Sequence, residues 1–476
     1  MTDHTNPVKQ VQTSGPTSQV KAPDRRGVTC ARFGAGARLG VPRAGGIRAG
    51  AALLGLALAV GIAACDFDVV NPGPVQDDFL DNPDAHAPLV AGAQRLLMQG
   101  LNLNSMNGGA VVREIFPAGS TSAFGITLLQ QRGILEFDDE HVTWTNQQRA
   151  RSVAEQGLAR FDGLESVDMM NYVPAAELAL VAGYAGRVLG ENYCEAVIDG
   201  GGIEPHTVFL ERAVANFDLA IQIGQNVGRS DVVTAAYAGR AQVRAVLGDW
   251  QGALADADRV PLDFVHVAEH NTITDAQFNR IYWASANAPY RAHSVWNTVV
   301  EEYYLDTGDP RTPWGQDPTV PVGDAAVDRV GQVPWYFQLK YPERDSDRNL
   351  ASGREMLLIR AEAALNGVGG DWQTAMDYIN SLREGLVSDH DGEPIPLWEA
   401  NSAEEAWTFL KRERYIELWL EGRRLGDRRR WAEAGTPGQY SPLEVPGEAS
   451  FLTDQSLCYP IPLQERETNP NVPEVP

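Results

Sequence analysis

Apolar residues recur at helical spacing, with unusual density, in the sequence FLKRERYIELWLEGRRLGDRRRW near the C-terminal end of the chain. Ile416 and Leu420 follow Phe409 after seven and eleven residues, and neighbouring apolar residues widen this stripe into a face broad enough to bury. The pattern predicts a helix with one buried face. Gly422 and Gly426 predict that the chain turns where this helix ends.

The charged residues of the same stretch are spaced so that they can form ion pairs. Glu413, Glu417 and Glu421 follow one another at a spacing of four, while arginines gather toward the C-terminal end, where cations suit the helix dipole. Guanidinium groups and carboxylates pair bidentately, so we expect a structural ion network here, with a phosphate or nucleic-acid site as the alternative. Its expected members are Glu413, Arg414, Glu417, Glu421, Arg423, Arg424, Asp427 and Arg428.

Helical periodicity also runs through the earlier part of the chain. A first helix is expected over 77–103, with Asp84 as a cap and Gly108-Gly109 as its end, and helix resumes over 146–164. Paired amphipathic helices are then predicted at 175–194 with 211–223, and at 231–259. After the arginine-rich stretch, residues 432–476 are rich in proline and predict an extended segment without a further helix.

A short internal repeat supports a helical-hairpin architecture. Arg-Ala at 240–241 leads to GDWQGA at 248–253, and Arg-Ala at 360–361 leads to GDWQTA at 370–375. Helix, Gly-x-aromatic turn and a small alanine where the second helix approaches is the tetratricopeptide pattern, here interrupted. We therefore predict an all-α fold whose tetratricopeptide-like hairpins, at about 146–260 and 350–431, form a scaffold.

Residues 261–345, between the two repeats, change in character. Aromatic residues crowd among Pro, Gly, Asn and Asp without a long period, which indicates a loop-rich insertion. Rings on irregular loops suit recognition because they stack on sugars or grip side chains at little entropic cost, although any one of them could instead pack the insertion onto the helices. The ligand-binding candidates are Tyr282, Trp283, Tyr290, Trp296, Tyr303, Tyr304, Trp314, Trp335 and Tyr336.

Charge limits the kinds of partner. The chain of 476 residues has a formal net charge of −24. Residues 1–64 contain eight Lys/Arg and two Asp/Glu, so the remainder carries 31 basic and 61 acidic residues, a net charge of −30. Such a surface repels nucleic acid and anionic membrane, and no nucleic-acid partner is expected.

The N-terminal region has the features of an export signal. Arginines precede an apolar run at 49–64, which is shorter than the roughly 20 residues that span a bilayer. The run ends Ile-Ala-Ala-Cys at 62–65 and resembles a bacterial lipobox. This resemblance implies removal of residues 1–64, lipidation of Cys65 and a tether over 65–76; a short membrane anchor is the alternative.

Two cysteines remain once Cys30 of the leader and Cys65 are set aside. They are Cys194 and Cys458. In an exported chain two such thiols favour a disulfide, with two buried free thiols as the alternative.

Four separated stretches together resemble the SusD/RagB family of nutrient-binding outer-membrane lipoproteins. They are the lipobox and tether at 62–74, the EMLLIRAE motif at 355–362 with Arg383, the Glu413 to Trp431 signature, and Pro-Ile-Pro at 460–462 with Asn469-Pro470. The resemblance implies that 77–476 is a SusD-like α/α superhelix carried as a surface-exposed lipoprotein of the cell outer membrane. It would capture an oligosaccharide or peptide with the insertion and deliver it to a TonB-dependent SusC-like transporter.

Other functions find less support in the sequence. No Gly-x-Ser-x-Gly elbow, His-Glu-x-x-His helix or phosphate loop occurs, so we expect no catalytic residue and no cofactor. The acidic run at 345–349 lacks the glycine and distal glutamate of a calcium loop, and no metal site is predicted. A periplasmic tetratricopeptide-type lipoprotein that holds protein partners is the alternative function.

Overall fold

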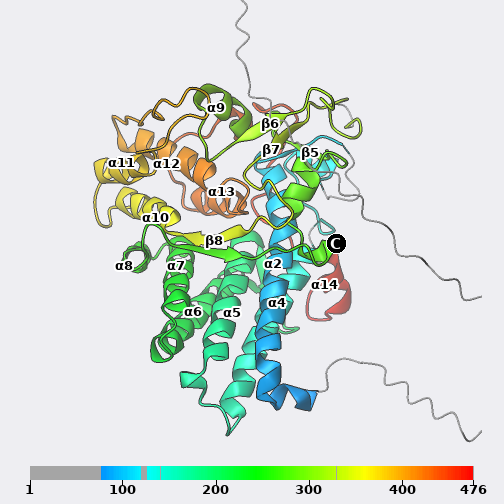
Figure 1. Cartoon of the computed structure of the whole chain (residues 1–476), viewed down its shortest axis with the longest axis vertical. Helices are drawn as coiled ribbons and strands as arrows, with labels where there is room; N and C mark the ends of the chain where they lie inside the picture. Colours follow the sequence, from blue (N-terminus) through cyan, green and yellow to red (C-terminus); the bar gives the residue numbers. More distant parts are fainter. Residues whose placement is uncertain (1–76, 120–125, 140, 328–329, 475–476) are drawn as a thin grey trace, which may run out of the picture. The chain divides into compact units, whose positions relative to one another are not determined.

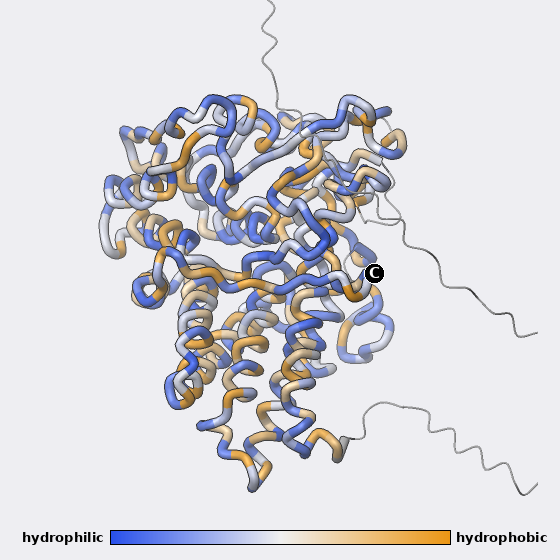
Figure 2. The backbone as a smooth tube through the Cα atoms, viewed as in Figure 1, coloured by the Kyte–Doolittle hydropathy of each residue, from blue (hydrophilic) through white to orange (hydrophobic). Residues whose placement is uncertain are grey.

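The long helices of the computed structural model pack one against the next along the chain (Figure 1). They are α2 (His86–Val111), α4 (His141–Gly163), α5 (Val173–Asn192), α6 (Thr207–Asn226), α7 (Ser230–Val246) and α8 (Trp250–Ala257). The structure describes residues 77–119, 126–139, 141–327 and 330–474. Helix α5 contacts α4 and α6, α6 contacts α7, and α7 contacts α8, which is the stacking expected of tetratricopeptide-like hairpins. Figure 2 shows apolar residues recurring along these helices.

Glycines let the helices of this layer approach closely. A Cβ atom at Gly183 of α5 would lie 2.6 Å from the ring of Phe217, and one at Gly239 of α7 would lie 2.4 Å from the same ring. Phe217 of α6 is fully buried and fills the space that these two glycines leave. The aromatic ring therefore takes the place of side chains on both neighbouring helices, and the core of this layer is built around it.

The two predicted hairpins are present and their turns have the same chemistry. Asp249 caps α8 by accepting a hydrogen bond from the Gly252 N–H (3.0 Å). Asp371 caps α11 (Trp372–Ser381) by accepting one from the Thr374 N–H (3.0 Å). These side chains satisfy donors that a helix N-terminus leaves unpaired. The all-α, tetratricopeptide-like prediction is confirmed.

A second group of helices follows the insertion in the sequence. It comprises α10 (Gly353–Leu365), α11, α12 (Ala403–Glu417) and α13 (Arg424–Glu433). Helix α10 packs against α8 as well as against α11 and α12, so the second group continues the stack that the first one begins. Its own apolar core includes Leu358, Ile379, Trp407, Leu410 and Trp431.

The arginine-rich stretch is two helices with the turn predicted at Gly422 between them, but the first helix ends before Leu420, which its periodicity assigns to the same helix. Helix α12 ends at Glu417 and α13 begins at Arg424, because Leu420 (φ 60°) and Gly422 (φ 73°) adopt left-handed backbone conformations between them. Gly426, predicted at a turn, lies inside α13, where its missing side chain lets the helix approach Glu191.

Several other boundaries also differ from the sequence-based expectation. The first helix runs through Gly108 and Gly109 to Val111, and α4 begins five residues before the expected start. The C-terminal segment contains a short helix, α14 (Leu463–Thr468), which the prolines on its N-terminal side concealed. The remaining short helices are η1 (Asp77–Asp81), η2 (Pro83–Ala85), α3 (Leu128–Gln131), η3 (Met169–Asn171), η4 (Asp275–Gln277), the π-helix η5 (Tyr282–Ala286), α9 (Val299–Thr307) and η6 (Pro442–Glu444).

The strands form short antiparallel ribbons. The pairs are β1 (Phe116–Pro117) with β5 (His293–Ser294), β2 (Glu195–Val197) with β3 (Ile203–Pro205), β4 (Val265–Ala268) with β8 (Arg348–Ser352), and β6 (Trp314–Gln316) with β7 (Tyr336–Gln338). In the β4–β8 ribbon, Ala268 lies opposite Arg348. The chain between them, almost the whole predicted insertion, therefore leaves and re-enters the scaffold at one point. Figure 1 shows β8 passing between the two groups of helices.

Candidate functional site

The first group of aromatic rings in the insertion is centred on Trp283. Trp283 lies on η5 and Tyr290 in the turn that follows; their rings stack with centroids 4.9 Å apart and planes inclined by 30°. Phe278 lies 5.1 Å from the Trp283 ring. Trp283 and Tyr290 are both partly exposed, whereas Phe278 is buried. Because π-helical turns are rare and concentrate at functional sites, this solvent-reached pair is a candidate ligand surface.

The second group lies on the β6–β7 ribbon. Trp314 is opposite Gln338, and Tyr336 lies two residues before Gln338, so Trp314 and Tyr336 are diagonal neighbours on one face of the ribbon. Their rings stack with centroids 4.7 Å apart and planes inclined by 25°. Tyr304 of α9 lies 6.1 Å from Trp314. All three rings are partly exposed, so solvent reaches this second group of rings as well.

Both groups rest on the same part of the core. The rings of Trp283, Tyr290, Trp314 and Tyr336 all pack against one apolar cluster, and η5 also contacts β7. The cluster includes Met106, Ala110, Ile281, Val295, Tyr415, Trp419 and Leu420. Helix α2 and the end of α12 thus support both ring pairs from behind, which holds the pairs in place before any ligand arrives.

Two other predicted rings are used in packing. Trp335 is 2% exposed, and its indole N–H donates to the Ser285 carbonyl oxygen (3.0 Å). Trp296 meets Phe116 edge to face, with centroids 5.1 Å apart. Trp335 therefore packs within the insertion, Trp296 packs the insertion against β1, and neither belongs to the two stacked pairs.

The two remaining predicted rings differ in their surroundings. The Tyr303 hydroxyl donates to Asp309 (2.7 Å) and accepts from Arg383 (3.0 Å), so Tyr303 belongs to the buried ion network described below. Tyr282 precedes Trp283 on η5 and is partly exposed. Of the nine predicted rings, five therefore form the two stacked groups and Tyr282 lies beside the first of them.

Sequence reasoning missed three residues that contact these rings. They are Phe278, Arg344 and His390. His390 lies 5.0 Å from the Tyr304 ring and comes from a loop more than eighty residues further along the chain. The ring contacts of all three depend on tertiary packing, and no local pattern in the sequence marks them.

Buried carboxylates of α12 hold the segment that leads into β6. Arg311 donates to Asp309 through two bonds (3.0 and 2.7 Å), pairs with Glu413, and donates to Glu417 (2.9 Å). Arg354 of α10 also donates two hydrogen bonds to the Glu417 carboxylate (2.6 and 2.9 Å). Arg311 precedes Trp314 by only three residues, so this network fixes the start of the strand that carries the second ring group.

Burial and charge act in opposite directions on these carboxyl groups. Burial raises the pKa of Glu413 above its ordinary value, and the charges of Arg311 and Arg383 offset only part of that rise. Burial also acts to raise the pKa of Glu417, but the hydrogen bonds of Arg354 and the charge of Arg311 bring it below the ordinary value. Each of the two carboxylates has two arginine partners, so removing Arg311 would leave both with only one partner and with part of their buried charge uncompensated.

A second tie joins the far end of the insertion to the turn between α12 and α13. The Lys340 ammonium donates to the Glu421 carboxylate (2.9 Å) and to the carbonyl oxygens of Glu417 (3.2 Å) and Trp419 (2.8 Å). Lys340 follows β7 by two residues. The insertion is therefore fastened to the signature stretch on both sides of the β6–β7 ribbon.

The other residues of the signature stretch bind the helices to one another. Arg414 pairs bidentately with Asp427 (2.8 and 2.9 Å). Arg423 bridges Glu191 of α5 (2.9 Å) and Glu355 of α10 (2.6 Å). Such forks match carboxylate geometry and are buried here, so they fix the relative positions of four helices.

Two further arginines of the stretch face the segment after α13. Arg424 donates to Glu444 through two bonds (2.8 and 2.6 Å). Arg428 lies 3.6 Å from the same carboxylate and places its guanidinium 3.7 Å from the centre of the Tyr440 ring. All eight residues expected in the network thus lie in buried or partly buried ion pairs.

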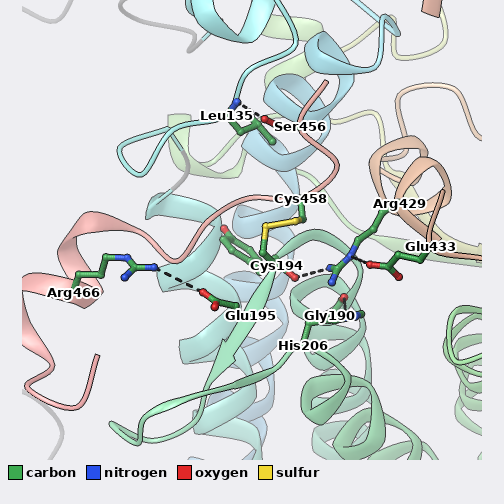
Figure 3. Close-up of a disulfide and its surroundings, with 11 residues drawn as sticks. Leu135, Gly190, Cys194, Glu195, His206, Arg429, Glu433, Ser456, Cys458 and Arg466 are labelled. Atoms are coloured by element: carbon green, nitrogen blue, oxygen red, sulfur yellow. Dashed lines mark hydrogen bonds and ion pairs between the residues drawn. A yellow bond between two sulfur atoms is a disulfide. The ribbon is translucent and has the colours of Figure 1, made fainter. Parts of the chain in front are cut away.

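The C-terminal segment is held against α5 by a disulfide. The Sγ atoms of Cys194 and Cys458 are joined at 2.02 Å (Figure 3). On either side of it, the Cys194 N–H donates to the Tyr459 carbonyl (2.9 Å) and the Leu135 N–H donates to the Ser456 hydroxyl (2.9 Å). Figure 3 also shows Arg429 bound to Glu433 beside the bridge. The disulfide and the hydrogen bonds together therefore hold the C-terminal segment on the scaffold.

Some sequence-based predictions concern residues outside the described structure. The export signal, Cys65 and the tether all fall within residues 1–76. Among the helices of residues 77–119, 126–139, 141–327 and 330–474, none combines the length and the apolar character needed to cross a bilayer.

Comparisons with known proteins agree with this architecture. The profile of the SusD family matches residues 354–476, which contain α10 to α14 and the signature stretch. A search of curated protein sequences found no significant match.

Solved structures with the same fold cover most of the chain. Surface glycan-binding protein A from Bacteroides uniformis has a TM-score of 0.59 at 14% identity and covers 82% of this chain and 98% of its own. A laminarin-binding SusD-like protein has a TM-score of 0.52 at 13% identity, with coverages of 83% and 99%. A chitin-binding SusD homologue from Flavobacterium johnsoniae has a TM-score of 0.52 at 13% identity, with coverages of 76% and 87%.

The chain thus shares the fold of these solved structures, and in this protein that fold is a helical scaffold that carries a loop-rich insertion. Its C-terminal part, residues 354–476, matches the model of the SusD family.

Proposed function

We propose that this protein binds a nutrient glycan on the two stacked ring pairs of its insertion. The observation that carries the proposal is that Trp283–Tyr290 and Trp314–Tyr336 are partly exposed, stacked, and supported by one apolar cluster. Sugar rings present apolar faces of C–H groups, which pack against aromatic rings while their hydroxyl groups remain solvated. Two separate, partly exposed ring pairs suit a chain of several sugars, in which different sugars contact different pairs.

Three structural relatives support a glycan over a peptide. Their names describe a surface glycan-binding protein, a laminarin-binding protein and a chitin-binding protein. Binding without catalysis is part of the same proposal, because stacking holds a sugar without breaking a bond in it.

Delivery to a transporter completes the proposed role. We infer that cleavage before Cys65 and lipidation of that cysteine anchor the protein to the outer membrane, on the cell surface, with residues 65–76 as the tether and 77–476 as the SusD-like domain. Glycan bound to the insertion would then be passed to a TonB-dependent SusC-like transporter. The signature stretch supports this arrangement, because it keeps the insertion fixed to the scaffold.

A binding assay with ring variants tests the proposal. Retardation in gels containing laminarin, chitosan or other glycans identifies a ligand for the mature protein, and calorimetry then compares Trp283→Ala and Trp314→Ala with the native chain. Loss of one stacking surface should weaken binding about tenfold, the equivalent of roughly 1.4 kcal/mol. Tyr237→Ala is the matched control, because Tyr237 is a partly exposed ring on α7, outside the insertion.

Two results would contradict glycan binding by the rings. One is native affinity in both tryptophan variants, and the other is an equal loss in Tyr237→Ala. A protein that binds no glycan but captures periplasmic proteins through its helical hairpins would instead support the alternative role of an assembly scaffold.

A further inference from the structure

An arginine lies against the first ring pair. The Arg344 guanidinium carbon is 4.9 Å from the centre of the Trp283 ring and 5.2 Å from that of Phe278. Arg344 itself is exposed. Cation–π attraction in this geometry holds a guanidinium over aromatic rings without neutralising its charge. A ligand stacked on the Trp283–Tyr290 pair would therefore lie beside a positive charge.

A buried asparagine fixes the backbone from which Arg344 projects. The Asn279 N–H donates to the Arg344 carbonyl oxygen (2.7 Å), and its side-chain amide donates to the Ser346 carbonyl oxygen (2.9 Å). The Asn279 side-chain oxygen accepts from the Ile281 N–H (3.0 Å) at the start of η5. Asn279 is fully buried, so one residue positions both the turn that carries Trp283 and the loop that carries Arg344.

The charge of Arg344 is uncompensated within the described part of the chain. Most arginines there pair with a carboxylate, as Arg311, Arg414 and Arg423 do, whereas Arg344 forms no ion pair with any described residue. Its neighbours Glu343 and Asp345 are exposed as well. The other exposed arginines of the described residues, Arg95, Arg149, Arg259 and Arg412, likewise form no ion pair; Arg344 differs from them because its guanidinium lies against the Trp283–Tyr290 pair.

We propose that Arg344 selects glycans that contain uronic acids. The planar fork of a guanidinium matches a carboxylate bidentately, and a guanidinium already stacked on rings loses little entropy when it binds. A sugar ring stacked on Trp283 and Tyr290 would place the carboxylate of the same or the next residue on Arg344. The proposal rests on the glycan-binding function and names the class of glycan.

Matched acidic and neutral polymers test the proposal. The detergent-solubilised mature protein is titrated with polygalacturonate and with its methyl ester, and with alginate and its propylene glycol ester, because esterification removes the charge and keeps the sugars. Laminarin and chitin oligosaccharides serve as neutral ligands with other linkages. We expect an acidic polymer to bind at least tenfold more tightly than its ester, with an affinity that falls as salt is added.

Substitutions then assign the preference to Arg344. Arg344→Gln should weaken binding of the acidic polymer about tenfold, the loss expected for one charge-assisted hydrogen bond, and leave binding of the ester unchanged. Arg344→Lys should restore part of the loss, because it keeps the charge but lacks the fork. Arg259→Gln is the matched control, since Arg259 also lies over a ring, that of Tyr237, outside the insertion.

The outcomes separate this proposal from the glycan-binding function. Equal affinity for acid and ester, or an acidic preference that survives Arg344→Gln, overturns the role of Arg344 and leaves glycan binding standing. Binding confined to laminarin or chitin oligosaccharides likewise overturns the role of Arg344 and leaves glycan binding standing. Failure to bind any of these polymers contradicts glycan binding itself, and with it the role of Arg344.

Discussion

Burial raises the pKa of Glu114 from its ordinary value of 4.5 to about 8. Its carboxyl group accepts one hydrogen bond, from the Leu420 N–H (3.2 Å), and its backbone oxygen accepts another from the Trp419 indole (2.9 Å). A carboxyl group in this setting is protonated in the folded protein at neutral pH and ionised in the unfolded chain. Glu114 therefore makes stability depend on pH in the direction opposite to a salt-bridged carboxylate.

We expect Glu114→Gln to remove this dependence. The folded state binds the extra proton between pH 4.5 and about 8, so stability from Glu114 is complete below pH 4.5 and is lost as pH rises through 8. Relative to the native protein, the variant should gain on the order of 2 kcal/mol between pH 6 and pH 9.5. Urea unfolding of both proteins at the two pH values measures the change. An unchanged difference would mean that Glu114 titrates normally.

The candidate site shows at the residue scale what the sequence reveals and what it leaves out. The density of rings in the insertion marks the segment, because thirteen aromatic residues crowd among turn formers at 261–345. Which of these rings meet in pairs, however, depends on how the strands and loops align. Trp314 meets Tyr336 only because β6 and β7 align with a particular offset, and Arg344 meets Trp283 only through the contacts of Asn279.

At the scale of elements, the break between α12 and α13 allows the signature stretch to act as a clamp. Gly422 has φ 73°, and a Cβ atom there would lie 2.8 Å from the Ser105 hydroxyl and 3.1 Å from the Asn104 amide of α2. A side chain would thus meet both backbone strain and a neighbouring helix. The turn also places Glu421 against Lys340, so its geometry bears directly on how the insertion is held.

Gly422→Ala should destabilise the protein by about 2 kcal/mol or more. Gly435→Ala is the matched control, because Gly435 also has a left-handed backbone (φ 60°) but no atom within 4 Å of its would-be Cβ. That variant should lose only about 1 kcal/mol. Chemical denaturation measures the free energy of unfolding of both variants, and the difference between their losses is the steric cost of a side chain next to α2. Equal losses would show that the approach to α2 contributes nothing.

Local sequence patterns predicted the helices that are stabilised by local interactions. The helices around Trp250 and Trp372 follow from apolar periodicity and from the capping aspartates Asp249 and Asp371. The break at Leu420 could not be predicted from local signals. The left-handed backbone of this leucine is held by its contact with Glu114, more than three hundred residues earlier. Pairing of β4 with β8 was equally hidden, since it joins strands about eighty residues apart.

For the whole molecule, the proposed anchoring makes a prediction about location. Cys65→Ala should move the protein from the membrane fraction to the soluble fraction, because no lipid would then attach to the tether. Cell fractionation with immunoblotting measures the change, and Cys458→Ser, which leaves the lipobox intact, is the control. Retention of the Cys65→Ala protein in membranes would contradict lipidation at this residue.

The transporter partnership can be examined on the same membranes. Tagged native protein, solubilised in mild detergent and purified, should bring a large outer-membrane barrel with it in near-equal amount, as identified by mass spectrometry. Recovery of soluble periplasmic proteins alone would favour the scaffold role.

The pairing of β4 with β8 has a consequence for how such proteins diversify. Because the insertion starts and finishes on neighbouring residues of one ribbon, Ala268 and Arg348, its length can change without moving any helix of the scaffold. A replacement would have to keep the contacts that anchor the insertion: Arg311 and Lys340, which reach the signature stretch, and the pairing of β5 with β1. A different binding specificity could therefore be built on this scaffold by keeping these anchoring contacts and redesigning the rest of the insertion.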